Sequence, residues 1–114
     1  MASVLLVEDE ALIRMMIADM LTELGHSVAG EAPDLTSGLM LASAPGVDAA
    51  ILDLQLGKDS SEPIAIELEK RGIPFAFASG YGADGMPQTF KDHPVLQKPF
   101  PMDELQRCMA KLLG

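Results

Sequence analysis

Apolar residues follow two alternating patterns along the chain. Short, nearly continuous apolar runs, the second of them weaker than the others, lie at residues 4–7, 26–31, 49–52, 73–78 and 95–97. Runs of this length predict strands buried on both faces, as in a parallel sheet. Segments with apolar residues every three or four positions, which predict helices, lie at residues 12–24, 34–44, 63–71 and 101–112. Strands that alternate with helices indicate an α/β fold with a parallel sheet and helices on both faces.

Two connections are less regular than the rest. Residues 55–61 are polar and contain a glycine, which predicts a loop. Residues 80–94 hold three glycines and two prolines and leave room only for a short helix, around residues 87–91.

Polar residues follow the predicted strands at the point where each strand ends. Glu8 and Asp9 follow the first run, Asp53 the third, Ser79 the fourth and Lys98 the last. The carboxyl ends of parallel strands meet at one edge of a sheet, so we expect these side chains to gather there. Three neighbouring carboxylates repel one another, which raises a pKa or calls for a hard divalent cation such as Mg²⁺.

A lysine and a hydroxyl beside such carboxylates suit a phosphoryl group. The ammonium of Lys98 and the hydroxyl of Ser79 can bind phosphoryl oxygens. Asp53 is the candidate nucleophile, because a carboxylate can attack phosphorus and become an acyl phosphate.

Composition narrows the class of protein. The 114 residues, 48% of them hydrophobic, fit one domain over residues 1–114. Eight Lys and Arg against 17 Asp and Glu give a net charge of −9, which argues against nucleic acid or an anionic membrane as a direct partner. The single Cys108 leaves no internal disulfide, and the sequence shows no signal peptide, lipidation motif or apolar run of 18 residues. We therefore expect a cytoplasmic protein.

On these residues the sequence resembles the receiver domain of two-component response regulators. Residues 4–10 are similar to the family's first strand and acidic pair, and residues 51–54 to its phosphoacceptor strand. Ser79 falls at the family's switch Ser or Thr, and residues 98–100 are its Lys-Pro-Phe. The resemblance covers essentially the whole chain and implies a flavodoxin-like (βα)5 sandwich of three layers, with sheet order 2-1-3-4-5.

The resemblance also implies a site and partners. Asp53 would accept a phosphoryl group from a phosphohistidine of a sensor histidine kinase or a histidine phosphotransfer protein. Mg²⁺ would be held by Asp9, Asp53 and the backbone carbonyl of Gln55, with Glu8 nearby or acting through water. The Lys98–Pro99 bond would be cis. With no output domain, the chain would signal to an unknown output protein by contact. Its chemistry would be limited to self-phosphorylation from a phosphodonor and autodephosphorylation.

A narrower resemblance concerns residues 77–82. They look like the motif of the FATGUG subgroup of receivers, many of which stand alone and some of which serve general stress signalling. Ser79 replaces the subgroup's Thr, and Gly80, Tyr81 and Gly82 would complete the switch. Val95 stands where many receivers carry a switching aromatic residue, so Tyr81 either reports phosphorylation instead or packs on the last helix.

Other functions are also compatible with the sequence. One is a phosphate sink or relay. Another is a binding module that keeps the receiver fold but whose binding does not depend on phosphorylation, and Val95 in place of an aromatic residue favours this alternative. The glycines at 80, 82 and 85 match a dinucleotide-binding fingerprint, but Pro87 interrupts the helix that this fingerprint requires.

Overall fold

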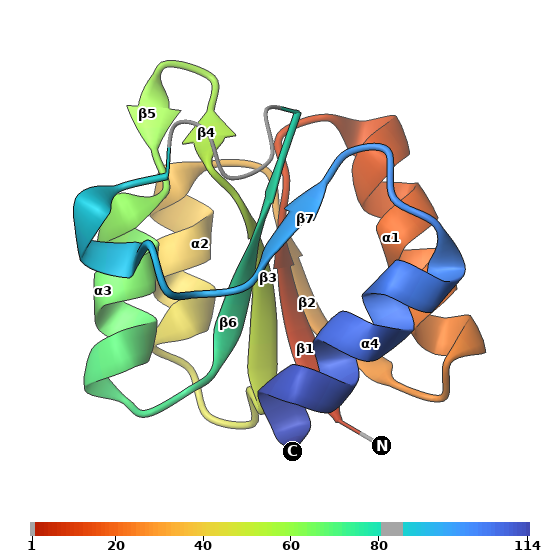
Figure 1. Ribbon diagram of the computed structural model, residues 1–114. Coiled ribbons are helices and arrows are strands. Elements are labelled where there is room, and N and C mark those ends of the chain that lie inside the picture. Colours follow the sequence, from red (N-terminus) through yellow and green to blue (C-terminus); the bar gives the residue numbers. More distant parts are fainter. Residues whose placement is uncertain (1, 81–85) are drawn as a thin grey trace.

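The computed structural model of the chain describes residues 2–80 and 86–114. Five parallel strands form one sheet in the order β2-β1-β3-β6-β7 (Figure 1). In chain order these strands are β1 (Ser3–Val7), β2 (Ser27–Ala32), β3 (Ala49–Asp53), β6 (Phe75–Ser79) and β7 (Val95–Gln97). This order corresponds to 2-1-3-4-5 and confirms the predicted flavodoxin-like fold.

Helices cover both faces of the sheet. They are α1 (Ala11–Glu23), α2 (Leu35–Ala42), α3 (Glu62–Lys70) and α4 (Met102–Leu113). Figure 1 shows α2 and α3 on one face and α1 and α4 on the other. The N-terminus of α2 is capped as its sequence predicts, because Asp34 Oδ1 accepts a hydrogen bond from the backbone N–H of Ser37 at 2.8 Å.

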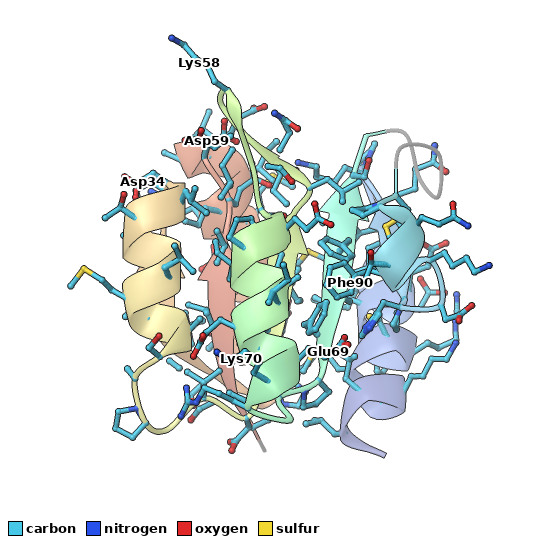
Figure 2. All side chains as sticks on the ribbon, turned by 90° about the vertical axis from the view of Figure 1, so that its left-hand side faces the viewer. Asp34, Lys58, Asp59, Glu69, Lys70 and Phe90 are labelled. Carbon is cyan, nitrogen blue, oxygen red and sulfur yellow. The ribbon has the colours of Figure 1, made fainter. Side chains whose placement is uncertain are left out.

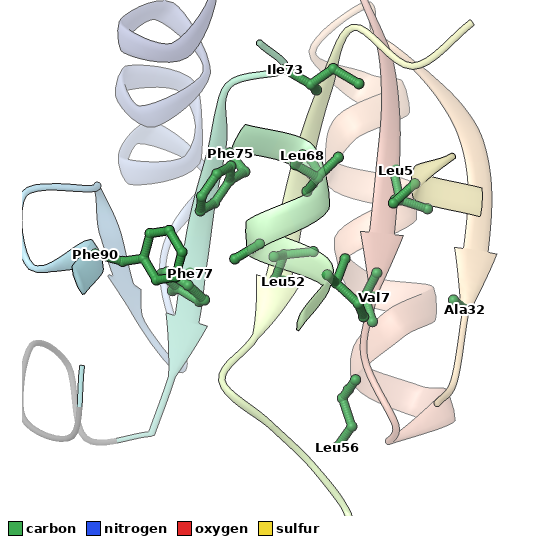
Figure 3. Packing of buried hydrophobic residues seen from close by; sticks show 14 residues of the cluster. Leu5, Val7, Ala32, Leu52, Leu56, Leu68, Ile73, Phe75, Phe77 and Phe90 are labelled. Atoms are coloured by element: carbon green, nitrogen blue, oxygen red, sulfur yellow. The ribbon is translucent and has the colours of Figure 1, made fainter. Parts of the chain in front are cut away.

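The alternation of side chains along buried strands divides the core into two clusters. In β3, Ala50 and Leu52 face the α2–α3 side, whereas Ala49 and Ile51 face the α1–α4 side. The α2–α3 cluster holds the aromatic side chains of β6 (Figure 3). Cys108 belongs to the α1–α4 cluster, and burial raises the pKa of its thiol to about 11.

Two segments differ from the sequence-based predictions. Residues 55–61, expected to be a loop, contain a hairpin of β4 (Gln55–Leu56) and β5 (Asp59–Ser60). Each strand of this hairpin has only two residues, too few for an alternating pattern to reveal it. Leu56 is buried in the α2–α3 cluster, and Gly57 takes a φ of 62° at the turn. The short helix expected around 87–91 is the 3₁₀ turn η1 (Gln88–Phe90), which buries Phe90 in the same cluster.

The apolar stripe of α1 is wider than the face that the sheet covers. Ile17 and Leu21 are buried, but Leu12 and Met16 are 76% and 58% exposed. Within residues 2–80 and 86–114, no helix is long and apolar enough to cross a membrane.

Candidate functional site

The predicted polar residues meet at the carboxyl edge of the sheet. Val7 pairs with Leu52 in the β1–β3 register, which places the residues after β1 beside the end of β3. Glu8, Asp9 and Asp53 each offer an oxygen that lies within 4.8 Å of the oxygens of the other two. The parallel topology therefore brings the three acids together, as their positions at the ends of strands predict.

Lys98 joins this cluster from the end of β7. Its Nζ lies 2.9 Å from Glu8 Oε1 and 3.3 Å from Asp53 Oδ2. The backbone N–H of Lys98 also donates to the carbonyl of Ser79 at 2.8 Å, so the ends of β6 and β7 are fixed together. Burial by itself would lower the pKa of Lys98, but the hydrogen bond to Glu8 and the charges of Asp53 and Glu8 outweigh it and raise that pKa. The Lys98–Pro99 bond is cis, as the resemblance implies.

Asp53 is a buried carboxyl group, 8% exposed, at the end of β3. Burial raises its pKa, the negative charge of Glu8 raises it further, and Lys98 only partly offsets these effects, so that the pKa lies at about 7. When no cation is bound, the Asp53 carboxyl group therefore titrates near neutral pH.

This raised pKa predicts how stability depends on pH. The native state holds the Asp53 proton more tightly than the unfolded chain, whose pKa is near 3.8. The contribution of Asp53 to the free energy of unfolding is therefore fully present below pH 4 and is lost as the pH rises to about 7. The rise of the pKa from 3.8 to about 7, which already includes the effect of Lys98, corresponds to about 4 kcal/mol over this range, and we expect about 2–3 kcal/mol of it to be lost between pH 5 and pH 8.

Urea unfolding in EDTA at pH 5 and pH 8 measures this effect. The native chain is compared at each pH with Asp53→Asn, which lacks the titrating group, so that the difference cancels the contributions of the other acids. An equal pH dependence in both proteins would contradict the prediction.

Asp9 and Gln55 lie at the open side of the cluster. Asp9 is exposed, and its Oδ2 accepts a hydrogen bond from the backbone N–H of Gly57 at 3.0 Å, which attaches the hairpin to the loop after β1. Gln55 begins β4, two residues after Asp53. Carboxylate and carbonyl oxygens are the donors that Mg²⁺ prefers, so the chemistry of these residues fits the ion.

The predicted switch residues are only partly described. Ser79 is buried, 4% exposed, at the end of β6, and Gly80 follows it at the same edge of the sheet. Tyr81 and Gly82 lie outside the described residues. Val95 pairs with Phe77 in the β6–β7 register.

Sequence reasoning missed Arg14 and a groove beside the site. Arg14 Nη1 donates to the carbonyl of Glu8 at 2.7 Å, and its Nε lies 3.3 Å from Glu31 Oε1. The one signal in the sequence that could have pointed to Arg14 is a positively charged residue among the apolar residues of α1. The groove, of about 410 Å³, opens between α1 and the segment after β7, where its lining includes Ile13, Lys98 and residues 99–100.

The hairpin extends this edge of the molecule. Figure 2 shows Lys58 and Asp59 on the hairpin, at the same end of the molecule as Asp34, the N-cap of α2, with Lys58 pointing away from the protein. Figure 2 also shows Glu69 on the side of α3 that faces η1, and its Oε2 lies 3.1 Å from Nε2 of His93. His93 and Glu69 thus tie the segment after η1 to α3, not to the acidic cluster.

Several proteins of known structure are similar to this chain in fold and sequence, and they are signalling domains. SdrG from Sphingomonas melonis Fr1 has a solution structure that is 43% identical, with a TM-score of 0.89, and the match covers 100% of this chain and 98% of that one. A further solution structure describes SdrG in a BeF3-activated conformation, at 43% identity and a TM-score of 0.84, over 98% of this chain and 96% of that one.

Two further proteins match with lower identity. The receiver domain of the sensor histidine kinase PA1611 from Pseudomonas aeruginosa PAO1, solved with magnesium in its active site cleft, is 25% identical with a TM-score of 0.81, over 99% of this chain and 98% of that one. The transcriptional regulatory protein PdtaR of Mycobacterium tuberculosis is 33% identical over 106 residues, which are 90% of this chain and 52% of PdtaR. The chain thus spans about half the length of this curated relative.

No family model matches the sequence. The fold, the acids and lysine at the carboxyl edge, and the 43% identity to SdrG over nearly the full length of both chains nevertheless agree. The chain belongs to the receiver domains of two-component response regulators, which are signalling domains and not classical enzymes.

Proposed function

We propose that this receiver accepts a phosphoryl group on Asp53 from a phosphohistidine of a sensor histidine kinase or a histidine phosphotransfer protein. The observation that carries the proposal is the position of Asp53 itself. It is a buried carboxyl group with the ammonium of Lys98 at 3.3 Å and the oxygens of Glu8 and Asp9 within 4.8 Å.

The reaction that this arrangement supports is a transfer between two nucleophiles. A carboxylate oxygen of Asp53 forms a bond to phosphorus while the bond from phosphorus to the donor's imidazole nitrogen breaks, and the electron pair stays on the imidazole. Lys98, already beside Asp53, supplies positive charge toward the phosphoryl oxygens. The hydroxyl of Ser79, at the end of the neighbouring strand, is our candidate for a hydrogen bond to one of them.

We further propose that Mg²⁺ serves this site. Asp9, Asp53 and the backbone carbonyl of Gln55 would hold it, with Glu8 nearby or acting through water. Bound there, the ion would neutralise charge on the phosphoryl oxygens and on the acidic cluster. The magnesium in the PA1611 receiver and the oxygen donors of this cluster support the assignment.

The surroundings of the site suit a protein as phosphodonor. Leu12, Met15 and Met16 are exposed on α1, and Met16 also lines the groove that reaches Lys98. Apolar side chains of this kind at the edge of a polar site are typical of a protein-binding surface. The donor's histidine could thus be brought to Asp53 by contacts on α1.

The proposal also concerns what phosphorylation of the domain does. We propose that the phosphorylated domain signals through contact with an output protein. Its membership of the FATGUG subgroup and a role in stress signalling stay predictions. The alternatives are a phosphate sink or relay, or a binding module that ignores phosphorylation. Val95, an aliphatic residue on β7, is the observation that favours the binding module. Equal affinity for a partner with and without beryllofluoride would identify that module.

Removal of Mg²⁺ tests the proposed function directly. Incubation with acetyl phosphate and Mg²⁺ is expected to add one phosphoryl group to the chain, detected as an increase in intact mass. An excess of EDTA should prevent the addition, because the uncompensated acids repel the phosphodonor. A chain that stays unmodified with Mg²⁺, or one modified equally in EDTA, would contradict the proposal.

A further inference from the structure

Arg14 connects the acidic loop after β1 to two neighbouring elements of the fold. Its side chain starts on α1 and is 19% exposed. Nη1 donates to the backbone carbonyl of Glu8 at 2.7 Å, and Nε lies 3.3 Å from Oε1 of Glu31 on β2. One guanidinium group therefore joins α1, β2 and the loop that carries the first two acids of the cluster.

The carbonyl that Arg14 contacts belongs to the peptide bond between Glu8 and Asp9. Because a peptide group is planar, a donor that fixes this carbonyl also fixes the direction in which the backbone continues to Asp9. The peptide group before Glu8 is fixed as well, since the N–H of Glu8 donates to the carbonyl of Ala32 at 3.0 Å. The backbone is thus held on both sides of Glu8, directly before Asp9.

Asp9 depends on this backbone more than the other two acids do. Glu8 and Asp53 are buried, 1% and 8% exposed, so their surroundings restrict their side chains. Asp9 is exposed, and its Oδ2 accepts a hydrogen bond from the backbone N–H of Gly57 at 3.0 Å. The place of the Asp9 carboxylate is therefore set by the direction of its own backbone and by the hairpin.

A guanidinium group suits this task. It stays protonated at every pH at which the protein is folded, and its planar fork presents donors in fixed directions to two acceptors. A hydrogen bond from a charged donor is also stronger than one from a neutral donor. Arg14 therefore attaches the loop to α1 and β2 more firmly than a neutral side chain would.

We propose that Arg14 is a positioning residue, which fixes the Glu8–Asp9 peptide group and so holds the Asp9 carboxylate in place for the cation. This role rests on the proposed function, because binding of Mg²⁺ by Asp9 is part of it. Arg14 acts through the backbone, from outside the set of oxygens that would bind the ion.

The metal-free chain provides the first test. In ¹H–¹⁵N spectra recorded in EDTA, the amide signal of Gly57 reports on the hydrogen bond to Asp9. Arg14→Met should shift this signal, and it should leave α1 intact because arginine and methionine have similar helix propensities. Arg107→Met, the same change at a side chain of α4 that is 69% exposed, is the matched control and should leave the signal unchanged.

Titration with Mg²⁺ provides the second test, at a temperature where urea unfolding shows each variant to be folded. We expect Arg14→Met to bind Mg²⁺ about tenfold more weakly than the native chain, as is typical when an outer partner of a metal site is lost. Glu31→Gln removes the charge that faces Nε but keeps the bond to Glu8, so it should bind with nearly native affinity. A purely structural role would lower the free energy of unfolding and leave the affinity of the folded chain unchanged.

The outcomes separate this role from the proposed function. An unchanged Mg²⁺ affinity in Arg14→Met would overturn the proposal, and so would an unchanged Gly57 signal. If Arg14→Met does not fold, Arg14→Lys carries the test: its single nitrogen cannot serve both acceptors in the same geometry, so native affinity in that variant would overturn the proposal. A native chain that binds no Mg²⁺ would instead contradict the proposed metal site, and the Gly57 signal would then decide whether Arg14 holds Asp9.

Discussion

Replacement of Asp53 by asparagine is expected to abolish phosphorylation of this domain. The replacement keeps the size of the side chain at a position that is 8% exposed, so the fold should persist. An amide is neutral and has no oxygen that can form an acyl phosphate, so the nucleophile is lost while Lys98 and Glu8 stay in place. Incubation with acetyl phosphate and Mg²⁺ should therefore leave the intact mass of Asp53→Asn unchanged.

A second acid on the same side of the molecule controls for loss of charge. Asp59 lies exposed on the hairpin (Figure 2), and Asp59→Asn should be phosphorylated as the native chain is. Beryllofluoride, a mimic of the phosphoryl group, should shift amide resonances near Asp53 in the native chain and in Asp59→Asn but not in Asp53→Asn. If Asp53→Asn gains a phosphoryl group at the native rate, another residue is the acceptor and the proposed function is wrong.

Replacement of Phe75 by alanine is expected to cause a large loss of stability. Phe75 is 1% exposed, and its ring centroid lies 5.6 Å from that of Phe77, 5.7 Å from that of Phe90 and 4.3 Å from that of His93. One side chain on β6 thus holds η1 and the residues after it against the sheet. Loss of a buried phenyl group leaves a cavity and costs about 3–5 kcal/mol, a large part of the stability of a domain of this size.

Urea unfolding followed by circular dichroism measures this loss. Ile66 on α3 is the matched control, because it is 49% exposed and its truncation to alanine removes few buried contacts. We expect Ile66→Ala to change the free energy of unfolding by about 0.5 kcal/mol or less. Similar losses for the two variants would mean that the aromatic cluster does not stabilise the fold as its packing indicates.

Much of the fold follows from the sequence for a simple reason. Strands buried on both faces need unbroken apolar runs, and residues 4–7 and 49–52 supply them. Contacts between residues a few positions apart in the chain can also be predicted from the sequence, as the hydrogen bond from the backbone N–H of Ser37 to the N-cap Asp34 shows. The hairpin at 55–60 escapes prediction because it has two residues in each strand, too few for alternation to show.

The sequence by itself determined which residues meet at the carboxyl edge, because every strand of a parallel sheet ends on the same side. The positions of Glu8, Asp53 and Lys98 along the chain are therefore enough to place them together. Only the tertiary structure decided how they pair. The ammonium of Lys98 lies nearer to Glu8 than to Asp53, across a separation of 90 residues in the chain. Such a pairing depends on strand register, side-chain length and burial together, and no local pattern of residues encodes that combination.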